Sequence, residues 1–305
     1  MNRNVIEIQG VTRHFGAIRA VDGVDLSVHE GEFFGLIGHN GAGKTTLFKL
    51  MLGLLQPTAG TISIDGQAVH GEEFRQIRRR IGYMPETVAL YDNLTGLETL
   101  RFFARLKHAD PASCMPLLEQ VGLAPAARRQ VRHYSKGMLQ RLTFAQALLG
   151  DPRILFLDEP THGLDPAGVR EFYETLRTLR EKGVTVVLTS HVLAEVQLRV
   201  DRLALMSSGK IRALGTVQAL RDELKLPLGF DVHMHNGAEV DLRQALAGFR
   251  IEGFRISGTV ASFECGRGDK LAVLAALSGL GGRLLDINVR EASLEDVFME
   301  YRGAQ

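Results

Sequence analysis

Cysteine is scarce in this sequence. The two cysteines, Cys114 and Cys265, lie far apart and form no Cys-x-x-Cys pair. Their number and spacing exclude a disulfide framework and a cysteine-rich zinc site.

Long apolar runs and an excess of either charge sign are also absent. The richest apolar stretch, residues 47–55, is short and contains Lys49, whereas a membrane-spanning helix needs about 18 uninterrupted apolar residues. Residues 1–8 lack the apolar core of a signal peptide, so a cytoplasmic chain is expected. The net charge is only +1, and we expect no nucleic-acid partner because wrapping nucleic acid needs a basic excess.

Glycine, in contrast, is abundant. It accounts for 33 of 305 residues, against an ordinary frequency of about 7%. The hydrophobic fraction of 45% and the charged fraction of 23% are those of a globular protein. A chain of this length is expected to form about two domains.

Strand-like and helix-like patterns alternate along residues 1–224. They predict an α/β domain with a mixed sheet core, in which parallel strands are covered by helices on both faces. Residues 87–150 are expected to form a helical subdomain, and Asp65-Gly66 is a hairpin signal. Strands are expected at residues 5–9, 24–28, 33–37, 61–64, 154–157, 184–189 and 203–206, and a helix at 44–55.

The pattern changes after residue 224. Residues 225–229 have the composition of a linker, and residues 225–305 are expected to form a small accessory α+β domain. Its strands are expected at residues 230–235, 254–256, 260–265 and 284–289, and its helices at 241–247, 269–280 and 293–301.

A glycine-rich loop lies between the expected strand at 33–37 and the helix that follows. Its sequence, Gly38-His-Asn-Gly-Ala-Gly-Lys-Thr45, has the spacing of a phosphate-binding P-loop. Glycines let backbone N–H groups approach a phosphate, and the helix directs the positive end of its dipole at the anion. Lys44 would neutralise the β- and γ-phosphates, and Thr45 would bind Mg²⁺. The alternative is a glycine-rich turn with an incidental lysine.

Two carboxylates follow the expected strand at 154–157. Asp158 emerges at the carboxyl end of the strand, the edge at which parallel sheets bind ligands, and would hold the water shell of the metal. Glu159 comes next and would hold the attacking water as general base. A strand end capped by two solvated acids is the structural alternative, which the P-loop upstream disfavours.

One segment resembles the signature motif of the ATP-binding cassette (ABC) proteins. The resemblance rests on Ser135 and Gly137, whereas Tyr134, Lys136 and Met138 depart from the commonest form. Ser135 would cap the following helix and offer its hydroxyl and N–H groups to a γ-phosphate. An ordinary helix cap is the alternative, disfavoured by the position of the segment just before the acidic strand.

Three more positions resemble motifs of the same family. Residues 160–165, ending in Asp165, resemble the D-loop, which links the two sites of a dimer. Ser190-His191 resembles the switch histidine that orients the attacking water. Phe15 stands where the family carries an aromatic that stacks on adenine. A solvated loop, a structural histidine and a core phenylalanine are the respective alternatives.

The resemblance covers roughly residues 5–220 and implies the ATPase subunit of an ABC transporter. It implies ATP and Mg²⁺ as cofactors, a homodimer that sandwiches two nucleotides, and a polytopic membrane permease as partner. The chain would then lie peripherally on the cytoplasmic side of the inner membrane. Glu159 and His191 would be catalytic, and Thr45, Asp158 and Glu86 would serve the metal. The residues expected at the nucleotide are Phe15, Gly38, His39, Asn40, Gly41, Ala42, Gly43, Lys44, Thr45, Thr46, Glu86, Ser135, Lys136, Gly137, Met138 and Asp165.

One departure concerns Glu86. The family usually carries glutamine after Gly-Tyr-x-Pro, whereas this chain has Gly82-Tyr-Met-Pro-Glu86. A carboxylate still accepts a hydrogen bond from a water on Mg²⁺, but it adds negative charge beside the metal.

Glu86 and residues 90–96 would face the permease in this family. Together with residues 133–140 they resemble the ATPase subunit of the transporter that matures the copper sites of nitrous oxide reductase. That resemblance implies a periplasmic copper-maturation protein, reached through the permease. Residues 292–298 resemble a segment of exporter subunits more widely, so the alternative is an exporter of a lipid, antibiotic or polysaccharide.

Other classes of protein are less favoured. Soluble ABC ATPases that act on nucleic acid or the ribosome tend to carry two cassettes, a long coiled coil or zinc modules, whereas this sequence shows one cassette. A nucleotide-regulated binding module without turnover is opposed by the presence of both Glu159 and His191. His233-x-His235 would put two imidazoles on one face of a strand, and solvated side chains are favoured over a copper site because no third ligand is evident.

Overall fold

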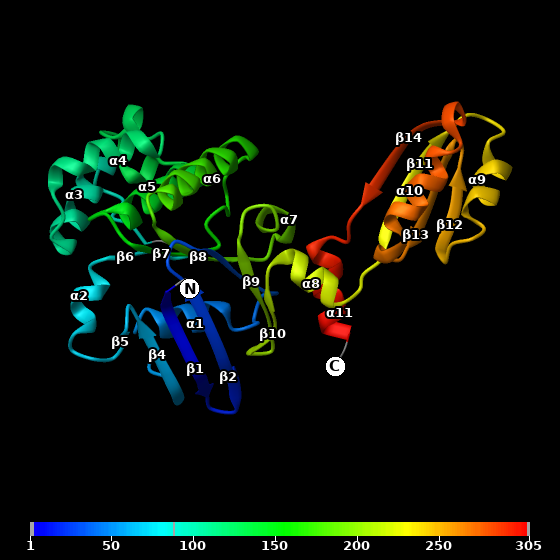
Figure 1. Ribbon diagram of the computed structural model, residues 1–305. Coiled ribbons are helices and arrows are strands. Elements are labelled where there is room, and N and C mark those ends of the chain that lie inside the picture. Colours follow the sequence, from blue (N-terminus) through cyan, green and yellow to red (C-terminus); the bar gives the residue numbers. More distant parts are fainter. Residues whose placement is uncertain (1–2, 88, 304–305) are drawn as a thin grey trace. The chain divides into compact units, whose positions relative to one another are not determined.

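The computed structural model describes residues 3–87 and 89–303 and divides into two units, Met1–Thr216 and Val217–Gln305. Figure 1 labels the elements of each unit. The sequence pattern predicts a boundary at residue 224, after helix α8 (Val217–Glu223). In the structure the division lies before this helix. The reason is that α8 packs against α11 (Leu294–Gly303) of the second unit.

Two sheets form the framework of the first unit. In its described residues, the larger sheet has the order β10-β9-β3-β8-β7-β6, and all neighbours are parallel except β10, which runs antiparallel to β9. The smaller sheet, β2-β1-β4-β5, is antiparallel. The strands are β1 Asn4–Phe15, β2 Ile18–His29, β3 Phe33–Ile37, β4 Ala59–Ile64, β5 Gln67–Ala68, β6 Ile81–Met84, β7 Ile154–Asp158, β8 Thr185–Ser190, β9 Arg202–Ser207 and β10 Lys210–Gly215.

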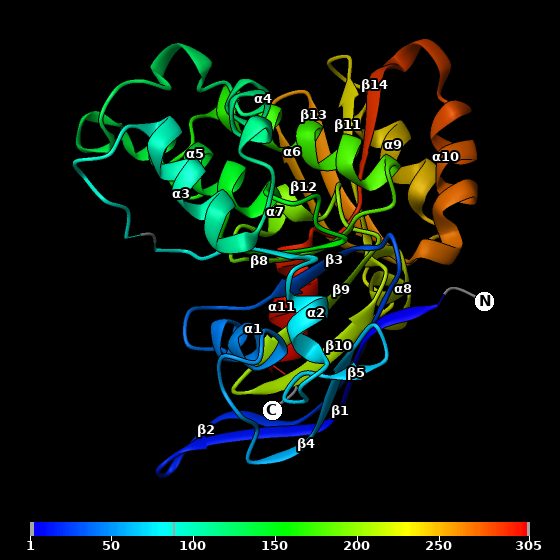
Figure 2. The same cartoon turned by 90° about the vertical axis from the view of Figure 1, so that its left-hand side faces the viewer.

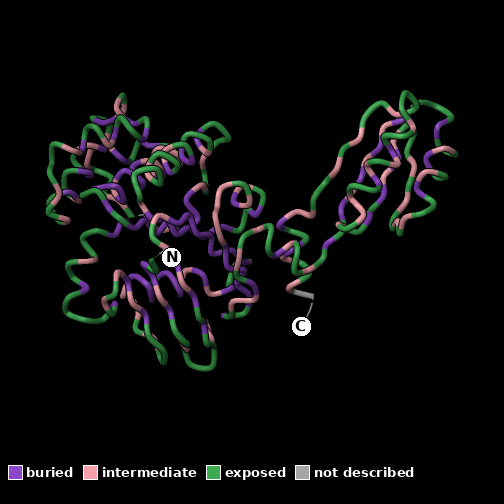
Figure 3. The backbone as a smooth tube through the Cα atoms, in the orientation of Figure 1, coloured by how far each residue is buried: buried purple, intermediate pink, exposed green. Residues whose placement is uncertain are grey.

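The main core lies where helix α1 (Lys44–Met51) meets both sheets. This helix contacts β2, β4 and β7, and Phe48 packs edge-on against Phe156 with ring centroids 5.4 Å apart. Strands β3, β7 and β8 are buried along their whole length, which explains their continuous apolar sequences. Figure 3 shows these strands as buried stretches of the tube.

The chain between β6 and β7 is helical, as the sequence predicted. Helices α3 (Gly96–Lys107), α4 (Cys114–Gln120) and α5 (Lys136–Leu148) pack on one another, and short 3-10 turns join them. Figure 2 shows these three helices grouped together. Because α5 also packs against β6, the subdomain is fixed to the edge of the larger sheet.

Some elements differ from the expected ones. Strands β6 and β10 and helices α2 (Phe74–Arg78), α6 (Pro166–Glu181) and α7 (Leu193–Val196) are additional. Helix α1 ends at Met51, earlier than expected, because Gly53 turns the chain with φ 65 and a Cβ there would lie 2.8 Å from the Val69 carbonyl oxygen. Asp65 and Gly66 join β4 to β5 as expected, both with positive φ.

The second unit has the expected α+β composition. Its described strands form an antiparallel sheet of order β12-β13-β11-β14, an arrangement of the ferredoxin-like βαββαβ type. Alternate residues of β11 are buried and pack against Leu242 and Leu246 of α9 and Val273 and Leu277 of α10, so both helices cover one face. The elements are β11 Leu228–Met234, α9 Glu239–Leu246, β12 Ile251–Ser257, β13 Val260–Cys265, α10 Lys270–Ser278 and β14 Leu284–Arg290.

The segment expected to be a linker belongs to this unit. Leu226 and Leu228 are buried, and Leu228 is the first residue of β11. The Pro and Gly residues that suggested a linker therefore mark the entry to a strand.

Candidate active site

The carboxyl ends of β3, β7 and β8 meet at one edge of the larger sheet. Ile37 pairs in register with Ser190, and Asp158 pairs with Thr189, so the loops that follow these strands begin side by side. A cavity of about 500 Å³ opens there. It is lined by Ile18, Arg19, Ala20, His39, Asn40, Gly41, Ala42, Gly43, Lys44, Thr45, Thr46, Glu86, Glu159, Ser208 and Gly209.

The phosphate loop is closely packed on its inner side. A Cβ at Gly38 would lie 2.4 Å from the Met206 carbonyl oxygen, and one at Gly43 would lie 2.2 Å from the Ala20 carbonyl oxygen. Gly43 has φ 105 and is the N-cap of α1, without any side-chain cap. The first N–H groups of the helix are thus left for an anion, as at other phosphate-binding helix termini.

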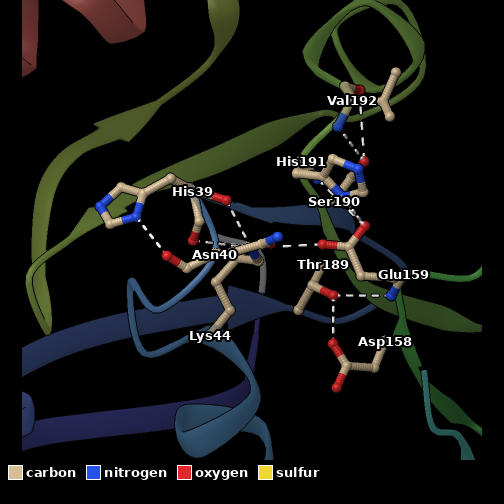
Figure 4. Close-up of polar contacts among 10 residues, drawn as sticks. His39, Asn40, Lys44, Asp158, Glu159, Thr189, Ser190, His191 and Val192 are labelled. Carbon is tan, nitrogen blue, oxygen red and sulfur yellow. Dashed lines mark hydrogen bonds and ion pairs between the residues drawn. The ribbon is translucent and has the colours of Figure 1, made fainter. Parts of the chain in front are cut away.

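Lys44 extends across the mouth of this loop. Its Nζ donates to the carbonyl oxygen of Gly38 at 2.6 Å and to that of His39 at 3.3 Å. The same nitrogen lies 3.5 Å from Oε1 of Glu159, and Lys44 is only 6% exposed. Figure 4 shows the lysine and the glutamate facing each other. A buried cation held this way is suited to phosphate oxygens.

The two acids are joined by a threonine hydroxyl that the sequence motifs did not reveal. Thr189 donates to Oδ1 of Asp158 at 2.6 Å and accepts from the backbone N–H of Glu159 at 2.9 Å. Burial raises the pKa of Asp158, while hydrogen bonds from Thr189 and Thr45 act in the opposite direction and the charge of Glu86 adds to the rise.

His191 completes the group around Glu159. Its Nδ1 lies 2.7 Å from Oε2 of Glu159, and its backbone N–H donates to the same oxygen at 3.3 Å. Ser190 is buried, and its Oγ accepts from the Val192 N–H at 2.9 Å, which fixes the turn that carries the histidine (Figure 4).

The oxygen donors of the site fit Mg²⁺. The hydroxyl of Thr45 lowers the pKa of the Asp158 carboxyl, and Oε1 of Glu159, which is ion-paired with Lys44, is buried without a hydrogen bond. Hard oxygen ligands of this kind, few in number, are what Mg²⁺ takes when phosphates and water fill the rest of its shell. Thr45 and Asp158 would therefore hold the ion, with Glu86 close enough to affect its charge balance.

Several residues expected at the nucleotide do not line this cavity. Ser135 caps α5 by accepting from the Met138 N–H, and Asp165 caps α6 by accepting from the Gly168 N–H. Neither residue lines the cavity, nor do Lys136, Gly137 and Met138. In the described chain they form a second group near the start of α5, where a Cβ on Gly137 would lie 3.5 Å from the Gly163 carbonyl oxygen.

Phe15 also lies outside the cavity lining, which includes Ile18 from the other side of the β1–β2 turn. Phe15 is 44% exposed, and the guanidinium of Arg13 stacks over its ring at 4.7 Å. It is therefore a surface residue and not part of the core.

Comparison with known proteins agrees with this geometry. A model of the ABC transporter family matches residues 21–162. A daunorubicin resistance ATP-binding protein of Streptomyces coeruleorubidus is 35% identical, and the match covers 99% of this chain and 97% of that protein. The chain belongs to the ABC transporter ATP-binding proteins.

Another relative and a solved structure are also similar to this ABC ATPase. A Nod factor export ATP-binding protein I of Burkholderia pseudomallei is 38% identical over 98% of this chain and 97% of its own length. The structure of a dimeric ATP-binding cassette in a post-hydrolysis state, bound to ADP and Pi, covers 70% of this chain and 98% of that chain, with 27% identity and a TM-score of 0.64.

ABC ATPases hydrolyse ATP, generally require Mg²⁺, and function as dimers with a membrane permease. Within residues 3–87 and 89–303, no helix combines the length and apolar character needed to cross a membrane.

Proposed function

We propose that this chain is the ATP-hydrolysing subunit of an ABC exporter, in which two copies power a membrane permease. The observation that carries the proposal is the meeting of Lys44, Glu159 and His191 at the end of β7. A cation at the phosphate loop, a carboxylate beside it and an imidazole on that carboxylate are the parts that phosphoryl transfer to water requires.

Lys44 and the N–H groups at the start of α1 hold the phosphates. When bound, Mg²⁺ neutralises charge on the β- and γ-phosphate oxygens. Thr45, from α1, and Asp158, from β7, would hold the ion.

Glu159 acts as the general base. Its carboxylate lies between Lys44 and His191, and its buried Oε1 is ion-paired with Lys44 without a hydrogen bond. A base in that place accepts the proton of the attacking water. His191 contacts the carboxylate at Oε2 and would sense the γ-phosphate.

The second group of motif residues supports a site shared between two copies. Ser135 caps a helix of 13 residues whose N-terminus is suited to an anion, yet it does not line the cavity of its own chain. Ser135 and Gly137 of the partner subunit would close over the γ-phosphate, and Asp165 would lie between the two sites. ATP then favours the closed dimer, and hydrolysis removes the link.

The cargo is proposed to be a small organic molecule carried outward. Relatives that function in daunorubicin resistance and Nod factor export support this class. The copper-maturation role, with its periplasmic copper partner, stays a prediction from the resemblance of Glu86, residues 90–96 and residues 133–140. It gains no support from these relatives.

The permease is proposed to dock on the surface that includes Tyr91. This residue is 57% exposed, and its ring packs edge-on against the half-exposed Phe102 of α3 at 5.6 Å. Glu86 lies at the cavity on the same connection between β6 and α3. Docking there would hold the chain at the cytoplasmic side of the inner membrane.

Glu159→Gln tests the proposal. The variant should bind ATP but lose hydrolysis by about 100- to 10,000-fold, the contribution of a general base. It should also elute as a dimer in ATP during size-exclusion chromatography with light scattering, because the bridging nucleotide is not cleaved. Phosphate release measures the turnover.

Glu174→Gln is the matched control, since Glu174 is an exposed glutamate of α6. It should hydrolyse ATP at the wild-type rate. Wild-type turnover by Glu159→Gln would show that the base is another group, and absence of ATP hydrolysis by the wild type would contradict the proposed function itself.

A further inference from the structure

Thr189 occupies a position that no nucleotide-binding motif assigns. It lies at the end of β8 and is fully buried. Its single hydroxyl uses its proton on Oδ1 of Asp158, at 2.6 Å, and a lone pair on the N–H of Glu159, at 2.9 Å. Figure 4 shows both bonds leaving the same oxygen. The hydroxyl therefore contacts the proposed metal-binding acid and the proposed base at once.

The bond to Glu159 acts on an uncommon backbone conformation. Glu159 has φ 48, in the left-handed region that non-glycine residues seldom adopt. Such a conformation persists only where its surroundings hold it. The hydrogen bond from the Glu159 N–H to Thr189 helps to stabilise this conformation. From it, the Glu159 carboxylate contacts Lys44 and His191.

The bond to Asp158 acts on the other acid. It occupies Oδ1 and so restricts the rotation of the carboxylate. Partners of this kind orient metal ligands from outside the coordination shell.

We propose that Thr189 is a positioning residue that sets the orientation of Asp158 toward Mg²⁺ and of Glu159 toward the attacking water. The inference rests on the proposed function, because it assigns these two acids to metal and base. One hydroxyl oxygen orients both acids. Its removal should therefore weaken Mg²⁺-dependent ATP binding and ATP hydrolysis together.

Thr185 provides a matched control on the same strand. It is also buried, and its hydroxyl accepts from the Gly31 N–H at 2.9 Å, at the opposite end of β8 from the acids. Thr185→Val and Thr189→Val thus remove the same atom from the same strand, and only the second touches the acids.

The test compares the two valine variants with Thr189→Ser, which keeps the hydroxyl. Equilibrium binding of a fluorescent ATP analogue is measured with Mg²⁺ and with EDTA. The expected result for Thr189→Val is an unchanged affinity in EDTA, a Mg²⁺-dependent gain reduced about 10-fold, and a kcat reduced about 10- to 100-fold. Thr185→Val and Thr189→Ser should keep the wild-type gain, even where their melting temperatures fall.

A Mg²⁺-dependent gain in Thr189→Val equal to that in Thr185→Val would overturn the inference, as would equal losses in Thr189→Ser and Thr189→Val. Should Thr189→Val not fold, Thr189→Cys takes its place, because a thiol is a weaker donor than a hydroxyl. Failure of the wild type to hydrolyse ATP would instead reject the proposed function. The comparison of ATP-analogue binding with Mg²⁺ and with EDTA would still test the role of Thr189.

Discussion

Gly41 and Gly43 are two residues apart in the phosphate loop, but side chains there would meet different surroundings. Both have positive φ, 82 and 105. A Cβ at Gly43 would lie 2.2 Å from a backbone oxygen, whereas no atom lies within 4 Å of one at Gly41. We expect Gly43→Ala to displace the loop and weaken ATP binding about 100-fold, and Gly41→Ala to cost about 1 kcal/mol of backbone strain.

Calorimetric titration with ATP and thermal melting measure the two effects. Equal losses of ATP affinity in the two variants would show that backbone freedom, and not space, is what the loop requires at both positions.

Site residues that belong to a recognisable motif could be predicted from the sequence. The spacing of the phosphate loop fixes one group, and the end of a buried strand fixes the other. Lys44 and Glu159 are examples, and they lie 3.5 Å apart. Thr189 could not be predicted in its role, because a threonine at the end of an apolar run is also an ordinary strand residue. Its function depends on the in-register pairing of β7 with β8, which brings it opposite Asp158.

At the scale of elements, Lys107 links the end of α3 to the end of α5. Its Nζ donates to the Leu149 carbonyl oxygen at 2.6 Å. Burial lowers the pKa of Lys107 to about 8, partly opposed by Asp151. The folded pKa lies below the model-compound value of 10.5, so the folded protein favours the neutral amine. The neutral Lys107 amine therefore contributes its full share to the free energy of unfolding above the unfolded pKa of 10.5. This contribution is lost as the pH falls through the folded pKa of about 8.

Lys107→Met removes this dependence. Between pH 8 and 10.5, the unfolding free energy of the wild type should rise relative to that of the variant, by up to about 1.4 kcal/mol per pH unit. Urea unfolding at several pH values measures the difference, with the exposed Lys182→Met as control. A constant difference across this range would contradict the lowered pKa.

Elements with strong patterns could be predicted, and those with mixed patterns could not. Strands β3, β7 and β8 are continuous apolar runs because they are buried throughout. Strand β10 is an edge strand with exposed residues and gives no such run. Helix α6 does carry a readable start, since Asp165 is its N-cap and Pro166 its first residue, although no helix was expected there.

At the scale of the whole molecule, the division at residue 216 makes the role of α8 testable. Arg221 of α8 forms an ion pair with Glu291 at 3.0 Å, and Asp222 forms one with Arg267 at 3.1 Å. Both pairs lie inside the second unit. A fragment of residues 217–305 should therefore fold with a melting temperature at least about 5 °C above that of residues 225–305, since each kcal/mol shifts a domain of this size by about 4–8 °C.

Circular dichroism melts of the two fragments measure this difference. Equal melting temperatures would show that α8 contributes nothing to the second unit and would favour the later boundary.

Ser135 and Lys44 belong to one chain, yet only Lys44 lines the cavity. If each completed site takes its signature residues from the neighbouring copy, a chain changed at both Lys44 and Ser135 spoils both sites of a mixed pair, its own and that of its normal partner. In a cell that makes both forms, mixed pairs would outnumber either pure pair when the two are equally abundant. Alleles that change both parts of the site and still assemble would then behave as dominant, whereas alleles that prevent folding would be recessive.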